Sequence, residues 1–343
     1  MGSFYTYRYS FLLVLVALIL ALVLNISLGS VTIPFGDTLK AVFGGTLENR
    51  SWKYIIWNYR IPKAFTAVMV GSGLALSGLL MQTFFRNPLA GPFVLGISSG
   101  ASLGAAILVM GSSLFSGLWA LGLVNDISLA LASSIGSFLV LMAVMVVASK
   151  VKDTMALLII GLMFGSITAA IVSVLSYFSD AERLRQYIFW SFGSLGNLSW
   201  SQLSLLFGIL TTGSVMGIFS IKALNALLLG ENYAKSLGVD LKTAKYMIIV
   251  ATGILAGGIT AFAGPIAFVG LAVPHLTRQI FNTTDHSILL PAVLMYGAIL
   301  MLLCDTVAQL PNSANVLPIN AITSILGAPV VIWLLVRKRK MVF

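Results

Sequence analysis

Charged residues are scarce in this sequence. Only 9% of its 343 residues are Asp, Glu, Lys or Arg, whereas 59% are hydrophobic, and an average soluble domain carries about 25% charged residues. A soluble core cannot bury so large an apolar fraction, so much of it must face lipid. Because a spanning helix takes about 20 apolar residues, the length accommodates roughly nine to eleven spans. The composition therefore predicts an all-α integral membrane protein that crosses the bilayer many times.

Residues that build reactive or metal-binding sites are equally few. The single cysteine, Cys304, has no partner for an internal disulfide. The two histidines, His275 and His286, are not part of a zinc-binding motif, so we expect no metal site. The chain also lacks the GxxxxGK[ST] phosphate loop, so it would not bind ATP itself. We therefore expect no cofactor in this chain and no enzymatic activity of its own.

Apolar runs predict helices at residues 11–28, 64–84, 93–111, 127–148, 154–177, 201–220, 246–262, 265–280, 288–307 and 319–336. The first run is longer than the apolar core of a secretory signal, so we expect it to remain as a span. An even number of spans places both termini on one side. With both termini in the cytoplasm, most of the 20 Lys and Arg residues fall inside, as the positive-inside rule requires. We expect one membrane domain over residues 1–343.

The net charge of +10 does not indicate nucleic acid, because the charges lie in short loops between apolar runs. A cluster on the predicted outer side nevertheless runs against the positive-inside rule. It comprises Lys40, Arg50, Lys53, Arg60 and Lys63. Arg60 and Lys63, at the start of the second span, could simply be interfacial anchors whose charged ends reach the lipid headgroups.

A polar segment at about residues 222–245 is too hydrophilic to span the membrane. Gly230 and Gly238 bracket about two turns of helix-forming residues within it. The segment could be a solvated connection, but a loop this long in a compact bundle is more often functional. We expect a rigid piece that fits a groove of a partner.

Two short turns and one acidic residue also stand out. Asn87-Pro88 and Asp153-Thr154 lie at predicted inner ends of helices, where turn and capping chemistry is a sufficient explanation. Asp305 lies near the outer end of the span at 288–307. An acid within the membrane can act as a proton relay, but Asp305 is close enough to the end to reach water or a helix terminus.

Several motifs resemble those of the FecCD family of ABC-transporter permeases. They are RIPKAFTAVMVGSGLALSGLLMQTFFRNPLAGPFVLGISSGASLGA at 60–105, LLGENYAKSLGV at 228–239, GPIAFVGLAVPHLTR at 264–278, TDH at 284–286 and ILGAPVVIWLL at 325–335. The resemblance extends over essentially the whole chain. It implies a homodimer, or a pair with a paralogous permease, in the bacterial cytoplasmic (inner) membrane. Two cytoplasmic ATPase subunits would bind ATP and Mg²⁺, and an extracytoplasmic binding protein would deliver the substrate.

The resemblance also implies roles for individual residues. Gly230, Ala234, Leu237 and Gly238 would contact the ATPase, and Asn87, Pro88, Asp153 and Thr154 would form the cytoplasmic gate. Arg60 and Lys63 would dock acidic residues of the binding protein. Lys63 stands where relatives commonly have Arg, and a third basic docking position corresponds to about Gln309, which is uncharged.

Relatives in this family import ferric siderophores, haem or cobalamin. We expect a ferric siderophore first, because it is the commonest cargo of the family, with haem or cobalamin as the alternatives. A different class of protein, an ion-driven secondary transporter, would instead need essential acidic residues inside the membrane and would work without ATP.

Overall fold

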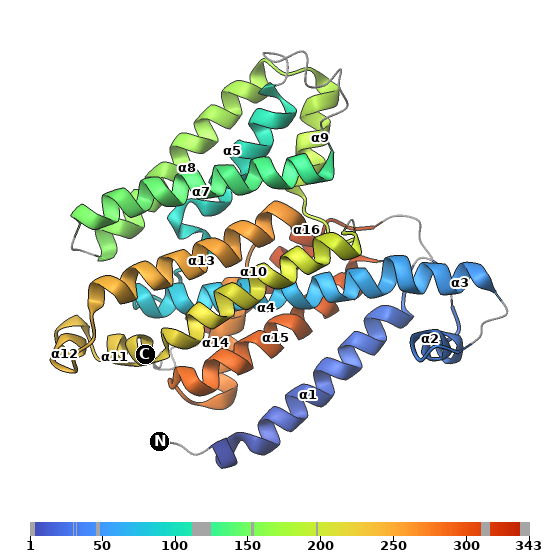
Figure 1. Cartoon of the computed structure of the whole chain (residues 1–343), viewed down its shortest axis with the longest axis horizontal. Coiled ribbons are helices and arrows are strands. Elements are labelled where there is room, and N and C mark those ends of the chain that lie inside the picture. Colours follow the sequence, from blue (N-terminus) through green and yellow to red (C-terminus); the bar gives the residue numbers. More distant parts are fainter. Residues whose placement is uncertain are drawn as a thin grey trace. The chain divides into compact units, whose positions relative to one another are not determined.

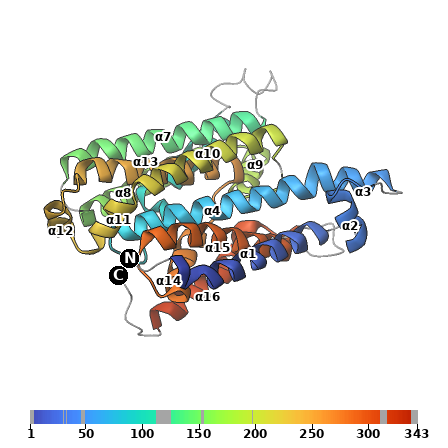
Figure 2. The same ribbon diagram turned by 60° about the horizontal axis from the view of Figure 1, so that its bottom comes forward.

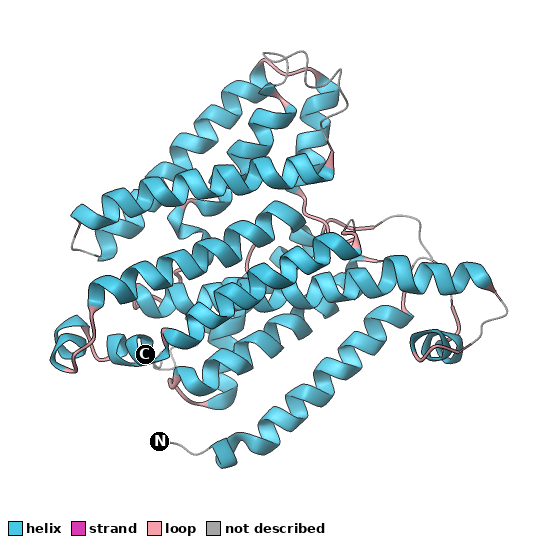
Figure 3. Cartoon of the chain, viewed as in Figure 1, coloured by secondary structure: helices cyan, strands magenta, loops and turns pink. Residues whose placement is uncertain are grey.

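The described residues of the chain fold into helices joined by loops. Its structure is a computed structural model that describes residues 4–29, 31, 33–45, 49–111, 125–151, 154–196, 198–309 and 316–336. Across these residues there are helices and loops and no strands (Figure 3). The predicted all-α fold is therefore confirmed.

Every apolar range predicted from the sequence coincides with a helix. These helices are α1 (Phe4–Ser27), α4 (Ile61–Phe84), α5 (Ile97–Val109), α7 (Asp126–Lys150), α8 (Thr154–Tyr177), α10 (Trp200–Phe219), α13 (Leu241–Ala263), α14 (Val269–Phe281), α15 (His286–Ala308) and α16 (Ile319–Val336). Within the described residues, 7 helical stretches are long and apolar enough to cross a membrane. α5 and α14 have 13 residues each and are shorter than a full span.

The remaining helices lie outside the predicted spans, except that η2 overlaps the start of the range 93–111. They are α2 (Phe35–Val42), α3 (Arg50–Ile55), the π-helix η1 (Ile56–Arg60), the 3-10 helix η2 (Pro92–Leu95), α9 (Ala181–Ser191), α11 (Ile221–Leu228) and α12 (Glu231–Ser236). α3, η1 and α4 form one continuous helix of 35 residues. Pro62 accounts for η1, because it has no amide hydrogen for the carbonyl of Asn58 and the helix widens just before it.

The chain forms two compact units, each built from segments distant in sequence. Unit 1 comprises Met1–Leu76, Ser194–Thr211 and Ala267–Phe343, and unit 2 comprises Ser77–Gly193 and Thr212–Ile266. α4 and α10 each contribute to both units. The single domain predicted over residues 1–343 stays a prediction.

In unit 1, α1 runs along α15 (Figure 1). Val14 of α1 is buried with Ile288 and Ala292 of α15 and with Phe281 of α14. The ring of Phe281 also lies 5.0 Å from that of Phe11. Burial of side chains of this size stabilises by about 1.5–3 kcal/mol each in water, but in lipid the close fit itself matters more.

The backbones of α4 and α15 touch. Gly71 and Gly297 face each other so closely that a Cβ on either would overlap the carbonyl of the other. Beside them, the hydroxyl of Ser72 donates to the carbonyl of Leu294 at 2.8 Å. Small residues and an interhelical hydrogen bond are the means by which helices associate in lipid.

In unit 2, glycines set the crossing of α5 over α7. A Cβ on Gly100 would lie 2.6 Å from the carbonyl oxygen of Gly136, and one on Gly104 would overlap the backbone of Ala132. The glycine repeat at Gly96, Gly100 and Gly104 thus serves packing within the bundle.

Candidate functional site

Unit 1 gathers polar side chains where the predicted outer ends of α1, α4 and α15 meet. The Nζ of Lys63 lies 3.0 Å from Oδ1 of Asp305. The other carboxylate oxygen accepts hydrogen bonds from the amide groups of Asn25 at 2.9 Å and Gln309 at 2.7 Å. We call these four residues the outer polar cluster. The side chain of Asp305 is only 3% exposed, so its charge is compensated by the protein and not by water.

The outer polar cluster joins three helices that are distant in sequence. Loss of Lys63 would leave the carboxylate of Asp305 buried without a counterion, which is more costly than loss of both charges. Both carboxylate oxygens of Asp305 are occupied by Lys63, Asn25 and Gln309. This residue therefore acts as a structural link in this arrangement, and a proton relay would require the cluster to open.

Arg60 lies beside this cluster and caps the end of α1. Its guanidinium donates to the carbonyl of Ile26 at 2.9 Å and of Ser27 at 2.8 Å, and also to the carbonyl of Val31. The last carbonyls of a helix lack partners and carry partial negative charge, so a cation is favourable there. Gly29 leaves room for the guanidinium, because a Cβ there would lie 3.0 Å from it.

Docking through Arg60 and Lys63 stays a prediction. Both side chains are bonded within unit 1, and Arg60 is only 7% exposed. A docking partner would have to exchange these internal bonds for its own. The pairing of Lys63 with Asp305 was missed from the sequence, although both residues were placed at the outer ends of their helices.

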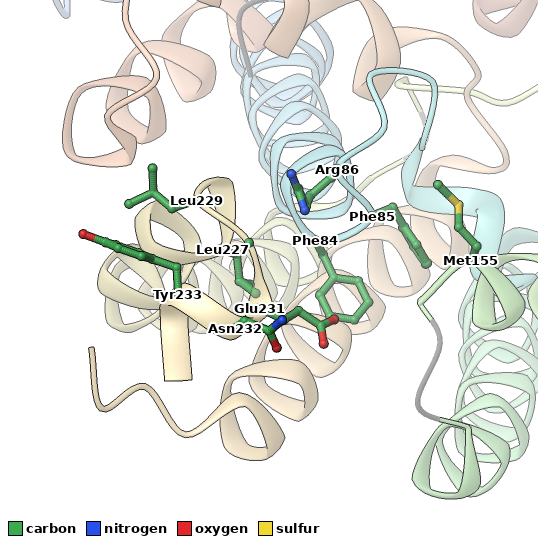
Figure 4. Close-up of a pocket in the computed structure, with 10 residues that line it drawn as sticks. Phe84, Phe85, Arg86, Met155, Leu227, Leu229, Glu231, Asn232 and Tyr233 are labelled. Atoms are coloured by element: carbon green, nitrogen blue, oxygen red, sulfur yellow. The ribbon is translucent and has the colours of Figure 1, made fainter. Parts of the chain in front are cut away.

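Unit 2 contains a pocket of about 670 Å³ at its predicted cytoplasmic end (Figure 4). It is lined by the end of α4, the first turn of α8 and the connection between α11 and α12. The lining residues are Phe84, Phe85, Arg86, Met155, Leu227, Leu229, Gly230, Glu231, Asn232 and Tyr233. Three segments that the sequence predicts on the inner side of the membrane thus meet at one place.

The end of α4 turns sharply at this pocket. Arg86 has a φ of 47°, in the left-handed region. Its amide donates to the carbonyl of Thr83 at 3.1 Å, and the amide of Asn87 donates to that of Gln82 at 3.0 Å. This pair of bonds is a Schellman motif, which satisfies the terminal carbonyls. The side chain of Asn87 then accepts from the amide of Leu89 at 2.9 Å, which fixes the following turn.

We call residues 221–240 the coupling segment. Gly230 and Gly238, with φ of 104° and 76°, flank α12. The predicted helical piece bracketed by two glycines is therefore confirmed, since positive φ favours glycine. Ala234 is fully buried and packs inward, whereas Leu237 is 57% exposed. Of these four positions, Leu237 is the one whose side chain exposes apolar surface.

Exposed apolar residues recur along the coupling segment at every fourth position. Leu229, Tyr233 and Leu237 are 63%, 51% and 57% exposed. Leu229 is the C-cap of α11, Tyr233 lies within α12, and Leu237 is the C-cap of α12. We call these three residues the coupling strip. An apolar strip on a hydrophilic segment marks an interaction surface. Leu229 and Tyr233 were missed from the sequence, although their spacing from Leu237 is visible there.

The coupling segment is tied firmly to the helix that follows. Asp240 caps α13 and accepts hydrogen bonds from the hydroxyl and amide of Thr243, and these bonds lower the pKa of Asp240 from its ordinary value. One turn later, Lys245 donates to the carbonyls of Ala148 at 3.1 Å and Val151 at 3.2 Å. A displacement of the coupling segment would therefore reach α13 and the end of α7.

The gate residues predicted from the sequence are only partly described. Asn87 and Pro88 form the half-buried turn after α4. Asp153 lies outside the described residues, and Thr154 is the first residue of α8. Their neighbours Arg86 and Met155 line the same pocket, but gating itself stays a prediction. Within the described ranges, no group of three or more His, Cys, Asp or Glu residues could hold a metal ion.

Comparisons with known proteins agree over nearly the full length. The profile of the FecCD transport family matches residues 17–337. The vitamin B12 import system permease protein BtuC of Klebsiella pneumoniae is 38% identical over 323 residues, which cover 94% of this chain and 92% of that protein. BtuC of Salmonella typhimurium is 36% identical, with 94% and 93% covered.

A solved structure is similar in both sequence and fold. It is described as a metal-chelate type ABC transporter in an inward-facing conformation, with 30% identity and a TM-score of 0.83. The match covers 97% of this chain and 100% of the other.

Proposed function

Because this chain belongs to the FecCD transport family, and is thus an ABC-importer permease, we propose that it carries a corrinoid such as vitamin B12 across the membrane. The observation that supports this cargo is the end-to-end similarity to permeases named for vitamin B12 import. From the sequence we expect a ferric siderophore first, with haem or cobalamin as the alternatives. The relatives favour the cobalamin alternative.

The proposed transport needs no covalent step. A corrinoid is a large molecule whose cobalt is already held by its own ring, so a permease needs a path of suitable shape and not a set of metal ligands. The protein would sit in the bacterial cytoplasmic membrane, as a homodimer or beside a paralogous permease, with lipid around it. An extracytoplasmic binding protein would deliver the cargo.

Energy would come from two partner ATPase subunits that hold ATP and Mg²⁺. We assign their contact to the coupling strip of Leu229, Tyr233 and Leu237, because these apolar side chains are exposed on a polar segment. Closure of the ATPases would move the coupling segment and shift the population between outward-open and inward-open states. Lys245 of α13 donates hydrogen bonds to the end of α7, so movement of the coupling segment would be transmitted to both helices.

An ion-driven carrier is the competing class. Such a carrier needs an acidic residue that can bind and release an ion within the membrane. Among the described residues, Asp305 is the only buried acid, and Lys63 compensates its charge at 3.0 Å. This pairing supports the ATP-driven reading.

The experiment is to measure ATP hydrolysis by the complete transporter in nanodiscs with its binding protein. We expect vitamin B12 on the binding protein to stimulate hydrolysis, and a ferric siderophore or haem to have little effect. Stimulation of hydrolysis by an iron chelate and not by vitamin B12 would refute the proposal that the cargo is a corrinoid. Hydrolysis that no loaded binding protein stimulates would refute the importer mechanism.

A further inference from the structure

The segment between α1 and α4 carries exposed basic and aromatic side chains on the predicted outer side. We call its described residues 33–45 and 49–60, which comprise α2, α3 and η1, the outer arm. Figure 2 shows α3 continuing α4 beyond the end of α1, with α2 beside it. Arg60 and Lys63 at its base are bonded inside unit 1. The exposed cations of α3 are Arg50 and Lys53, and neither has an ion-pair partner among the described residues.

The length of the continuous helix places α3 beyond the lipid. The continuous helix from Arg50 to Phe84 has 35 residues, or about 52 Å at 1.5 Å per residue. The hydrocarbon core is about 30 Å thick, and about 40–45 Å with the headgroups. If Phe84 lies at the inner edge of the hydrocarbon, the outer headgroups end near Arg60. About 15 Å of helix, including Arg50, Lys53 and Tyr54, then stands in water.

The exposed face of α3 has the composition of a protein interface. Arg50, Lys53 and Tyr54 lie three and four residues apart, so they share one side of the helix. Tyr54 is 59% exposed and stacks edge-on with Tyr59, with ring centroids 6.0 Å apart. Phe43 at the end of α2 is 84% exposed. Tyr and Arg dominate binding energy at interfaces, and the length of the helix places Arg50 and Tyr54 too far out to be covered by lipid.

The outer arm is ordered before any partner arrives. The indole N–H of Trp57 donates to the carbonyl of Ala41 at 3.0 Å, which holds α2 against η1. The side chain of Asn49 caps α3 by accepting from the amide of Ser51 at 2.9 Å. A surface held in its binding conformation loses less entropy on association.

The charge of the outer arm selects an acidic partner. Asp37 and Lys40 pair with each other at 3.7 Å, so they add no net charge, and α3 itself contains two cations and no acid. Glu48, the nearest acid in sequence, lies outside the described residues. We propose that Arg50, Lys53 and Tyr54 form the principal docking surface for an acidic face of the extracytoplasmic binding protein. In this arrangement Arg60 and Lys63 hold the base of the outer arm in place. The inference rests on the proposed importer function.

The test measures the affinity of the binding protein for the complete transporter in nanodiscs. Arg50→Glu with Lys53→Glu should weaken association by more than about tenfold at 50 mM salt, and the difference should shrink at about 0.5 M salt because charges are screened. Tyr54→Ala should weaken association by a similar factor at both salt concentrations, since its contact is apolar. Arg185→Glu on α9 removes an exposed cation elsewhere on the predicted outer side and should leave affinity unchanged.

The outcomes separate this inference from the proposed function. If the wild-type transporter binds the protein and both outer-arm variants bind equally well, the docking surface is wrong and the importer function stands. If the wild type does not bind, the proposed function itself fails. If the double reversal changes only the response to anionic lipid in the nanodisc, the outer arm is a lipid-binding surface and the inference is overturned. Arg50→Gln with Lys53→Gln serves as a milder pair should the reversal fail to fold.

Discussion

Replacing Lys63 with methionine should destabilise the protein more than replacing Asp305 with asparagine, although both changes break the same ion pair. The Asp305 side chain is 3% exposed and that of Lys63 is 18% exposed. Lys63→Met leaves a carboxylate that cannot reach water, and loss of one partner of a buried pair costs about 3–5 kcal/mol. The partial exposure of Lys63 points to the lower end of that range.

Asp305→Asn should cost less. Asparagine keeps the shape of the side chain, and the ammonium of Lys63 can extend along its flexible stem to water. The remaining loss is that of a charged hydrogen bond, about 1.5–3 kcal/mol. The double variant leaves no unpaired charge, so it should be more stable than Lys63→Met alone. The two substitutions should therefore be coupled by at least about 1 kcal/mol.

Cys304 provides the assay. It is the only cysteine of the chain, it is fully buried, and it adjoins Asp305 on α15. A thiol-reactive fluorogenic dye will label it only when this part of unit 1 opens, so labelling during a thermal ramp reports the stability of the region. Lys40→Met is the matched control, because its ion pair with Asp37 is exposed at 3.7 Å and such pairs contribute about 0–1 kcal/mol.

We expect a clear order among the midpoint temperatures of Cys304 labelling. Lys63→Met should be lowest, the double variant and Asp305→Asn should be intermediate, and Lys40→Met should match wild type. If Lys63→Met has the same midpoint temperature as Lys40→Met, the ion pair of Lys63 with Asp305 does not stabilise the outer end of unit 1. Strict additivity of the two single changes would equally refute the claim that the charges depend on each other.

Two further predictions concern the inner end and the packing. Leu237→Asp should lower substrate-stimulated ATP hydrolysis by more than about tenfold while membrane insertion persists, and Ser236→Asp, one residue away, is the control that should retain stimulation. Gly238→Pro should lower substrate-stimulated ATP hydrolysis in the same way, because Gly238 has a φ of 76° that proline cannot adopt. Wild-type stimulation in both Leu237→Asp and Gly238→Pro would refute the contact between the coupling strip and the ATPase. Gly104→Val should prevent stable folding because α7 leaves no room for a side chain, whereas Gly208→Val has open space and should be tolerated, as judged by yield and melting temperature.

The helices were predictable because lipid imposes a simple rule. Each span must satisfy its own backbone and present apolar side chains, so apolar length alone locates it. The short helix between Gly230 and Gly238 was predictable, because few residues other than glycine adopt the positive φ found at its two ends. The backward extension of α4 to Arg50 was not predicted, because polar residues there interrupt the apolar run while the backbone remains helical.

The side-chain arrangement at the outer end was the least predictable part. Arg60 and Lys63 were recognised as unusual because they oppose the positive-inside rule, but the sequence pattern does not say which groups they meet. Their partners, the end of α1 and Asp305, are set by the packing of three helices. The burial of Ala234 was likewise not predictable from the sequence, because its neighbours in sequence are exposed and only the fold buries it.

The most direct test of the account is uptake of radiolabelled vitamin B12 into proteoliposomes that contain this permease, its ATPase partner and its binding protein. We expect accumulation that requires ATP, requires the binding protein, and is not competed by a ferric siderophore or haem. Accumulation driven by an ion gradient without ATP, or uptake of an iron chelate in place of vitamin B12, would contradict it.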